Sequence, residues 1–189
     1  MRRIFRGVDR LGNAINERTG GNLQPGELYL FIIGLLNEYD PDFGNIDIEA
    51  IYSDLEQLIF RHPPRLLFDE APEVLRRLRA LPGVTTNLLS NTGFIRGRTL
   101  RPILDRLGLG RHFDFQLYSD ELQHSKPDPR VFAAVLQQVN TLHPDWNETR
   151  DVITHVGDNP RADVAGAQAV GWRAILVSKS FGLQDLLEG

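Results

Sequence analysis

The sequence contains no cysteine, and this absence excludes disulfide bonds, thiolate metal sites and cysteine nucleophiles. It also lacks a long hydrophobic run, because the most apolar stretch covers only residues 28–36, whereas a membrane-spanning helix needs roughly 20 apolar residues. The net charge of −4 over 189 residues implies no general attraction to nucleic acid or to an anionic membrane. These absences predict a cytoplasmic protein with no nucleic acid and no membrane as a partner.

Hydrophobic periodicity divides the chain near a pair of prolines at residues 63–64. Before this point the apolar residues recur at helical spacing, and turn-rich stretches separate three helical segments. The expected helices cover residues 28–39 and 48–60, preceded by one whose apolar stripe is Ile4, Val8, Leu11 and Ile15. We therefore expect a helical domain over residues 1–62 and a second domain over residues 63–189.

After the prolines, short apolar runs alternate with amphipathic segments. The predicted strands are residues 84–90, 113–119, 151–157 and 173–178, and the predicted helices are residues 70–83, 96–109, 128–140 and 161–171. Asp128 and Pro129 have the residue types that commonly begin a helix. Alternating strands and helices predict a doubly wound parallel α/β sheet, and such sheets bind ligands beyond the carboxyl ends of their strands.

Three of the predicted strands lead to polar residues suited to an anion or a cation. Ser90 ends the first of them and offers a hydroxyl beside backbone N–H groups, while Lys126 lies in the loop after the second. Asp158 and Asp163 follow the third, and paired carboxylates suit Mg²⁺. Each residue also has a purely structural interpretation, as a helix cap, a solvated lysine or a turn aspartate.

The order of these residues resembles the haloacid dehalogenase-like hydrolase superfamily, which consists mostly of magnesium-dependent phosphatases. The resemblance covers roughly residues 65–178, and its most specific pieces are "SKPDPRVF" and "VGDNPRADVAGAQAVGW". It implies a Rossmann-like α/β core with a small helical cap over residues 1–62 that closes over the site and selects the substrate.

The same resemblance implies a role for each matching residue. Ser90, with the backbone of Asn91, would hold the substrate phosphate. Lys126 would neutralise charge on the nucleophile and the phosphate. Asp158 would bind Mg²⁺, and Asp163 would support the metal site directly or through Lys126.

The family chemistry also needs a nucleophilic aspartate, which normally begins an Asp-x-Asp-Gly-Thr motif after the first strand. Only Asp9 and the residues after it come near, but Leu11 replaces the acid/base aspartate and Asn13 replaces threonine. A buried central strand should be nearly continuously apolar, and residues 2–9 contain three arginines. We therefore expect this segment to be helical, which leaves Asp9 a weak candidate nucleophile.

A missing first strand would leave two unpaired inner edges, because in the family this strand lies between those ending at Ser90 and Gly157. Three solutions are open: Met1 is an internal methionine of a longer protein or the chain is a fragment, residues 2–9 form a poor strand, or the flanking strands pair directly. We expect the first.

Three functions follow. One is a magnesium-dependent hydrolase that acts on a small phosphorylated metabolite through an aspartyl-phosphate. Another is a catalytically inactive relative that only binds phosphate or nucleotide. The third is an interaction protein that docks on an acidic partner through Arg2, Arg3, Arg6 and Arg10. The unpaired edges also make a homo-oligomer an open expectation.

Overall fold

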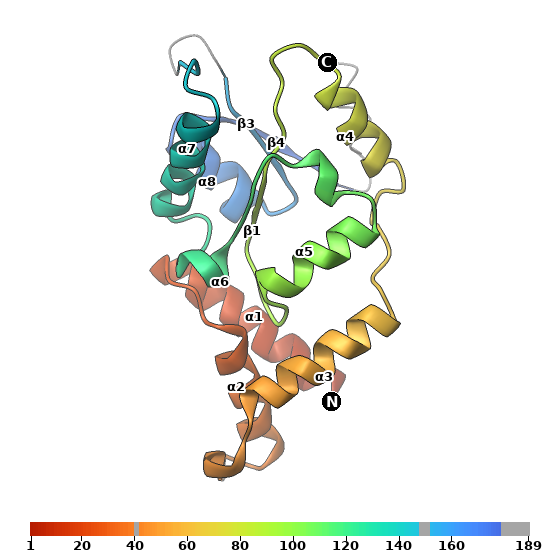
Figure 1. Ribbon diagram of the computed structural model, residues 1–189. Helices are drawn as coiled ribbons and strands as arrows, with labels where there is room; N and C mark the ends of the chain where they lie inside the picture. Colours follow the sequence, from red (N-terminus) through yellow and green to blue (C-terminus); the bar gives the residue numbers. More distant parts are fainter. Residues whose placement is uncertain (40–41, 148–151, 179–189) are drawn as a thin grey trace.

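The structure, a computed structural model, describes residues 1–39, 42–147 and 152–178 (Figure 1). Its α-helices are α1 (Arg2–Thr19), α2 (Pro25–Leu36), α3 (Ile48–Arg61), α4 (Ala71–Arg79), α5 (Gly97–Arg106), α6 (Ser119–Leu122), α7 (Pro129–Leu142) and α8 (Gly166–Ala169). The strands are β1 (Leu88–Ser90), β2 (Gln116–Tyr118), β3 (Thr154–Gly157) and β4 (Arg173–Leu176). Shorter helical turns are η1 (Phe43–Asn45), η2 (Gly110–His112) and η3 (Pro160–Ala165), of which η3 is a wide turn of π-helix.

Residues 2–9 belong to α1, as predicted, so the alternative that they form a poor first strand is wrong. The predicted apolar stripe of this helix needs correction at Leu11, which is 53% exposed. The buried side of α1 lies instead at Val8, Gly12 and Asn16. A side chain at residue 12 would come within 2.9 Å of Leu28, so glycine lets α2 approach α1 closely.

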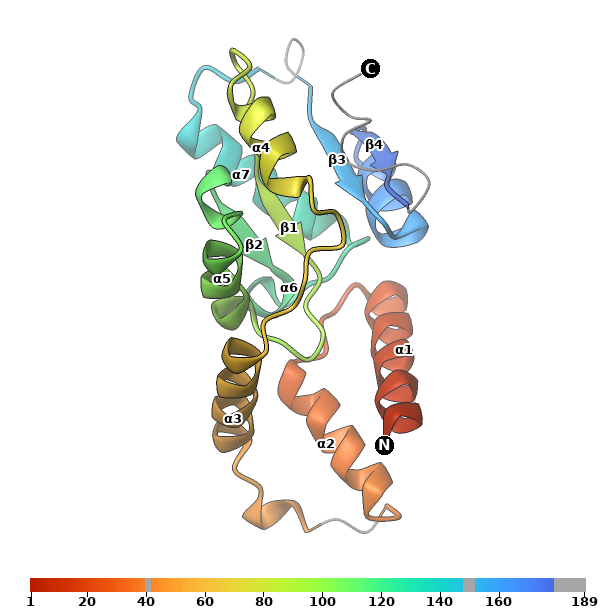
Figure 2. The same ribbon diagram turned by 90° about the vertical axis from the view of Figure 1, so that its right-hand side faces the viewer.

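The helices α1, α2 and α3 pack together at one end of the molecule (Figures 1 and 2). Their buried cluster consists of Val8, Leu28, Tyr29 and Ile32. Phe94, from the loop after β1, joins this cluster, with its ring centroid 5.5 Å from those of Phe5 and Tyr29. The Tyr29 hydroxyl donates to the Phe94 carbonyl over 2.6 Å. The loop beyond β1 is therefore fastened to the helical end of the chain.

The strands form two separate parallel pairs, β1 with β2 and β3 with β4 (Figure 2). The parallel α/β arrangement confirms the predicted fold class, but the strands are shorter than predicted. Within the described ranges β1 does not pair with β3, so the third alternative, direct pairing of these two strands, is also wrong. Part of the predicted strand 151–157 and the end of the chain lie outside the described residues.

Among the described residues, β1 and β3 each have one edge that pairs with no other strand. In a parallel ladder, alternate residues of a strand bond to the same neighbour. Leu88 donates to Phe115 and Val177 donates to Gly157, so Leu89 and Val156, one residue away in register, direct their backbone groups to the opposite side. We call these two sides the inner edges of β1 and β3.

The helix α7 holds the two strand pairs together from one face. Phe132 is 0% exposed and belongs to a buried cluster with Val131, and Leu89 of β1 and Ala174 of β4 pack against that cluster. The Trp172 ring meets the Phe132 ring edge-on at a centroid distance of 5.3 Å. Asp128 accepts a hydrogen bond from the Arg130 N–H and so caps α7, as predicted.

Among the described helices, none is both long and apolar enough to cross a membrane.

Candidate functional site

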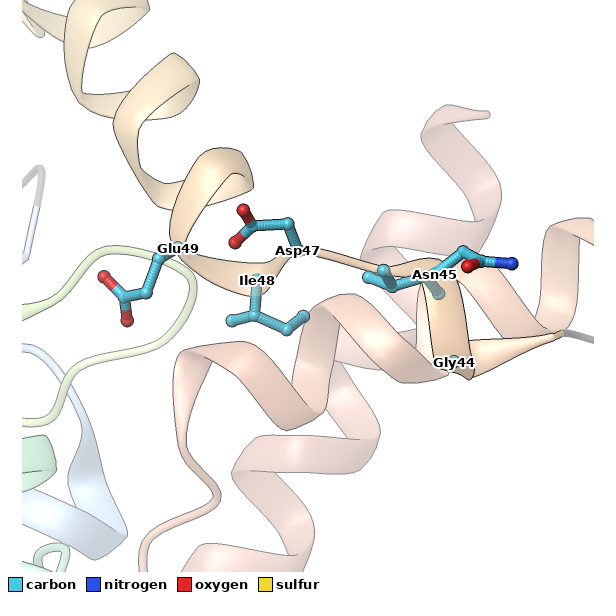
Figure 3. Close-up of a pocket in the computed structure, with 6 residues that line it drawn as sticks. Gly44, Asn45, Asp47, Ile48 and Glu49 are labelled. Carbon is cyan, nitrogen blue, oxygen red and sulfur yellow. The ribbon is translucent and has the colours of Figure 1, made fainter.

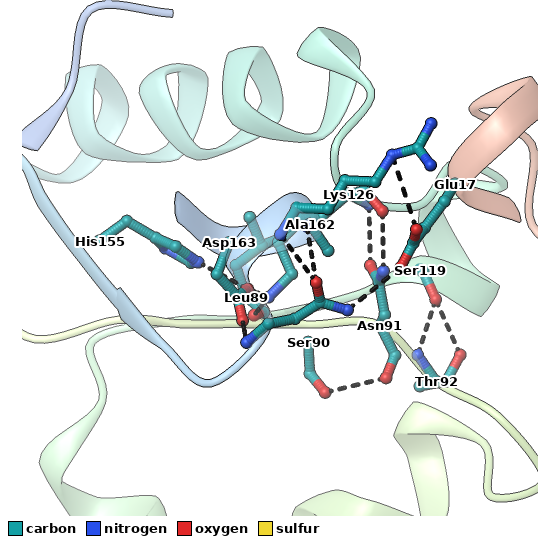
Figure 4. Close-up of polar contacts among 12 residues, drawn as sticks. Glu17, Leu89, Ser90, Asn91, Thr92, Ser119, Lys126, His155, Ala162 and Asp163 are labelled. Carbon is teal, nitrogen blue, oxygen red and sulfur yellow. Dashed lines mark hydrogen bonds and ion pairs between the residues drawn. The ribbon is translucent and has the colours of Figure 1, made fainter. Parts of the chain in front are cut away.

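Lys126 lies in the loop between α6 and α7, and its side chain is only 9% exposed. Its ammonium nitrogen donates to the Leu89 carbonyl on the inner edge of β1 over 2.8 Å and pairs with Asp163 Oδ1 at 2.7 Å (Figure 4). A lysine ammonium has three N–H donors, so these contacts leave one of them. The predicted lysine therefore reaches the strand ends and is held by two oxygen atoms.

Asp163 lies in η3 with a side chain that is 6% exposed, and it accepts from three donors. Besides Lys126, its Oδ1 faces Nε2 of His155 on β3 at 3.0 Å, and its Oδ2 accepts from the Asn159 N–H at 2.9 Å (Figure 4). Burial favours the neutral acid, but the hydrogen bond from His155 and the charge of Lys126 outweigh it and hold the pKa of Asp163 well below its ordinary value.

Gly157 makes room for this carboxylate, because a Cβ atom at residue 157 would lie 2.2 Å from Asp163 Cγ. Asn159 accepts from the N–H groups of Arg161 and Ala162 through its side chain, and this cap starts η3. The wide turn that follows returns Asp163 to the end of β3. The spacing from Gly157 to Asp163 is thus explained by a turn that folds the acid back onto its own strand.

Asn91 joins the loop after β1 to the loop that carries Lys126. Its side-chain Oδ1 accepts from the Lys126 N–H at 2.8 Å, and its Nδ2 donates to the Lys126 carbonyl at 2.9 Å. Both the oxygen and the nitrogen of this side-chain amide are therefore hydrogen-bonded, which leaves the backbone of Asn91 for the predicted phosphate contact. Ser90 donates to the Asn91 carbonyl over 3.3 Å, a long contact that a bound anion can replace.

Asp158 differs from Asp163 in being exposed. Its side chain has neither a hydrogen bond nor an ion pair with another described residue. No group of three or more His, Cys, Asp or Glu side chains in the described ranges could hold a metal ion. The residues present thus fit Mg²⁺ only in part: Asp158 offers a free carboxylate, whereas both oxygens of Asp163 are engaged by nitrogen donors.

The helix α1 lies beside the site through its last turn. Glu17 accepts from the Asn159 Nδ2 at 3.1 Å through Oε1 and lies 3.6 Å from the Arg161 Nε through Oε2 (Figure 4). Asp9 lies on α1 rather than after a strand, and its Oδ1 would be 3.8 Å from a Cβ atom at Gly93. The candidate nucleophile therefore lies on a helix beside the loop after β1, and not at the end of a strand.

The turn after α1 is hydrogen-bonded directly to the loop that carries Lys126. Ser125 donates its N–H to the Gly20 carbonyl at 3.3 Å and its hydroxyl to Asn22 Oδ1 at 2.8 Å. Gly21 and His124 form an antiparallel bridge. The position of Lys126 is therefore coupled to the position of the helical segment formed by α1, α2 and α3.

Replacing Gly20 with alanine tests this contact between the turn after α1 and the loop that carries Lys126. Its φ is +72°, and an added Cβ atom would lie 2.0 Å from Oδ2 of Asp128, the cap of α7. Gly83 is a matched control, because its φ is +74° with nothing within 4 Å. We expect Gly83→Ala to lower the free energy of unfolding by about 1 kcal/mol, and Gly20→Ala by about 3 kcal/mol, in urea denaturation. Equal losses would show that the close approach to Asp128 is unimportant.

Sequence reasoning missed His155 and Glu17 as site residues. A histidine within a predicted strand, two residues before Gly157, was the available signal, but its partner depends on η3. A further hollow, lined by residues 44–49, lies on the helical segment and not at the strand ends (Figure 3). It contains none of the predicted site residues.

Comparison with known proteins gives consistent matches. The haloacid dehalogenase-like hydrolase family matches residues 10–171. The chain is 37% identical over 137 residues to haloacid dehalogenase-like hydrolase domain-containing protein 3 of Homo sapiens, covering 71% of this chain and 50% of that protein. It is 32% identical over 133 residues to a phosphoserine phosphatase of Thermus thermophilus, covering 70% and 49% respectively.

Among solved structures, a magnesium-bound HAD-hydrolase of Bacillus subtilis has a TM-score of 0.67 and 16% sequence identity, covering 92% of this chain and 70% of that chain. The identity is low, so this likeness concerns the fold. The family match spans most of the sequence, and the chain belongs to the haloacid dehalogenase-like hydrolase family. It spans about half the length of the curated relatives it matches.

Proposed function

We propose that this chain is the phosphate-binding part of a magnesium-dependent phosphatase that acts on a small phosphorylated metabolite in the cytoplasm. One observation carries the proposal: the buried ammonium group of Lys126 is held at the end of β1 by the Leu89 carbonyl and by Asp163, and the next residue after Leu89, Ser90, has a weakly bonded hydroxyl. A phosphate group placed there would take the remaining N–H of Lys126, the Ser90 hydroxyl and the backbone of Asn91. The phosphoserine phosphatase among its relatives supports this substrate class.

The magnesium ion of the proposal would rest on Asp158. Mg²⁺ often takes only one or two protein carboxylates together with phosphate oxygens and water, and Asp158 is exposed and free of described partners. Bound there, the ion would supply positive charge next to the phosphate. Asp163 then acts through Lys126, and the predicted direct ligation by Asp163 remains an alternative.

Hydrolysis through an aspartyl-phosphate needs a nucleophilic carboxylate. No aspartate directly follows β1 in the sequence, and Asp120 after β2 accepts from the Gly97 N–H at the start of α5. Asp9 lies on α1. These placements favour two versions of the proposal: the nucleophile belongs to a longer form of the protein, or the chain is an inactive relative that only binds phosphate or nucleotide.

Thermal melting with inorganic phosphate tests the binding. Ligand present at about 100 times its dissociation constant stabilises the folded state by about 2.7 kcal/mol. We expect wild type to melt at a higher temperature with phosphate and Lys126→Met to lose that increase. Arg77→Met is a matched control, because it removes one positive charge from an exposed site on α4.

An unchanged increase in Lys126→Met, or an equal loss in Arg77→Met, would contradict the proposed site. A generic phosphate ester with Mg²⁺ then separates the two versions. Turnover that is lost in Asp158→Asn but survives in Asp9→Asn would rule out the inactive relative and the Asp9 nucleophile together. Phosphate binding without any turnover would favour the binding module.

A further inference from the structure

His155 makes a contact that the proposed chemistry does not require. Its Nε2 lies 3.0 Å from Asp163 Oδ1, the same oxygen atom that pairs with Lys126, and its side chain is 12% exposed. Its ring meets the Phe132 ring edge-on, with a centroid distance of 5.8 Å and an interplanar angle of 82°. The imidazole is thus fixed by packing on one side and by the carboxylate on the other.

Two donors on one oxygen restrict where that oxygen can lie. Without His155, Asp163 Oδ1 would keep only Lys126, and the carboxylate could turn about its Cβ–Cγ bond as far as the hydrogen bond from the Asn159 N–H to Oδ2 allows. Lys126 would follow, because its only other side-chain contact in the described ranges is the Leu89 carbonyl. The imidazole of His155 therefore influences the position of the Lys126 ammonium through Asp163, without direct contact.

We propose that His155 is a positioning residue: through Asp163 it fixes the Lys126 ammonium at the place where phosphate would bind. The last part of this statement rests on the proposed function, whereas the effect on Lys126 does not. Two substitutions separate the hydrogen bond from the packing. His155→Phe keeps a ring against Phe132 without the nitrogen atom, and His155→Gln places an amide nitrogen close to the position of Nε2.

The ammonium can be observed directly, because Lys126 and Lys179 are the two lysines of the sequence. In protein labelled with ¹³C,¹⁵N-lysine, Lys179→Arg leaves the signals of Lys126 alone. We expect Lys126 side-chain signals far from those of free lysine in wild type, shifted toward them in His155→Phe, and restored in His155→Gln. Trp172→Phe is the control for stability, because Trp172 contacts Phe132 and not the polar network.

Phosphate affinity, measured by calorimetry, is expected to fall about tenfold in His155→Phe, as is typical when a supporting hydrogen bond to a charged group is lost. It should recover in His155→Gln and stay unchanged in Trp172→Phe. Unaltered Lys126 signals in His155→Phe would overturn the proposal. If the Lys126 signals move in His155→Phe but wild type binds no phosphate, His155 still positions Lys126 and the proposed function fails. If the signals move but wild type and His155→Phe bind phosphate with equal affinity, the link to the phosphate site is wrong.

Discussion

Replacing Asp163 with asparagine is expected to lower the free energy of unfolding by about 3 kcal/mol, because breaking a buried ion pair leaves its partner charge without compensation. Lys126 would keep the Leu89 carbonyl but lose the carboxylate 2.7 Å away. The shape of the side chain hardly changes, so the loss reports charge and hydrogen bonding. Urea denaturation at neutral pH measures it, and phosphate stabilisation should disappear in the same variant.

A double-mutant cycle provides the control. In Lys126→Met, Asp163 retains the donors His155 and Asn159, so we expect a smaller loss than in Asp163→Asn. The double variant has no uncompensated charge from this pair and should be more stable than the sum of the single losses implies. Simple additivity would show that the two charges do not depend on each other.

The pH dependence gives a second control on the same carboxylate. The pKa of Asp163 is lowered in the folded protein, so its contribution is fully present above the ordinary aspartate value of about 3.9 and is lost as the pH falls toward the folded value. The stability difference between wild type and Asp163→Asn should therefore shrink below about pH 4. A constant difference across that range would mean that ionisation of Asp163 is not its source.

Much of this site could be predicted because parallel strands align their carboxyl ends. That rule brings the loops after β1, β2 and β3 to one edge. The order of Ser90, Lys126 and then the pair Asp158 and Asp163 along the sequence therefore predicted that these residues converge. The structure joins Lys126 and Asp163 in an ion pair, and the role of the acid through the lysine stays a prediction. The roles of Ser90, Asn91 and Asp158 in binding remain predictions.

Other features depend on contacts that hydrophobic periodicity does not encode. His155 meets Asp163 only because η3 is a wide π-helical turn, whereas the pattern predicted a regular helix. The predicted strand 84–90 begins with residues that remain exposed up to residue 85. An apolar, β-branched pattern marks extended chain, but a strand also needs a neighbour, and β2 pairs only with residues 88–90.

Supplying a further parallel strand between the inner edges of β1 and β3 is expected to give the chain, for which we propose phosphate binding, the turnover of an enzyme. Leu89 and Val156 direct backbone groups toward that place, and an added parallel strand would supply them with backbone hydrogen bonds. At present Lys126 occupies the Leu89 carbonyl. An N–H group of the added strand would donate to the Leu89 carbonyl in place of Lys126. The Lys126 ammonium could then bind the substrate and a carboxylate at the end of the added strand.

We expect this strand, ending in Asp-x-Asp, to be encoded in frame upstream of Met1. The longer form should melt at a higher temperature than the chain of 189 residues and should hydrolyse a phosphate ester with Mg²⁺. Replacing the first aspartate of the added segment with asparagine is the matched control: it should keep the gain in melting temperature, which comes from strand pairing, and abolish turnover, which needs the nucleophile. A stop codon directly upstream, or a longer form that melts no higher, would contradict this, because pairing both inner edges cannot leave stability unchanged.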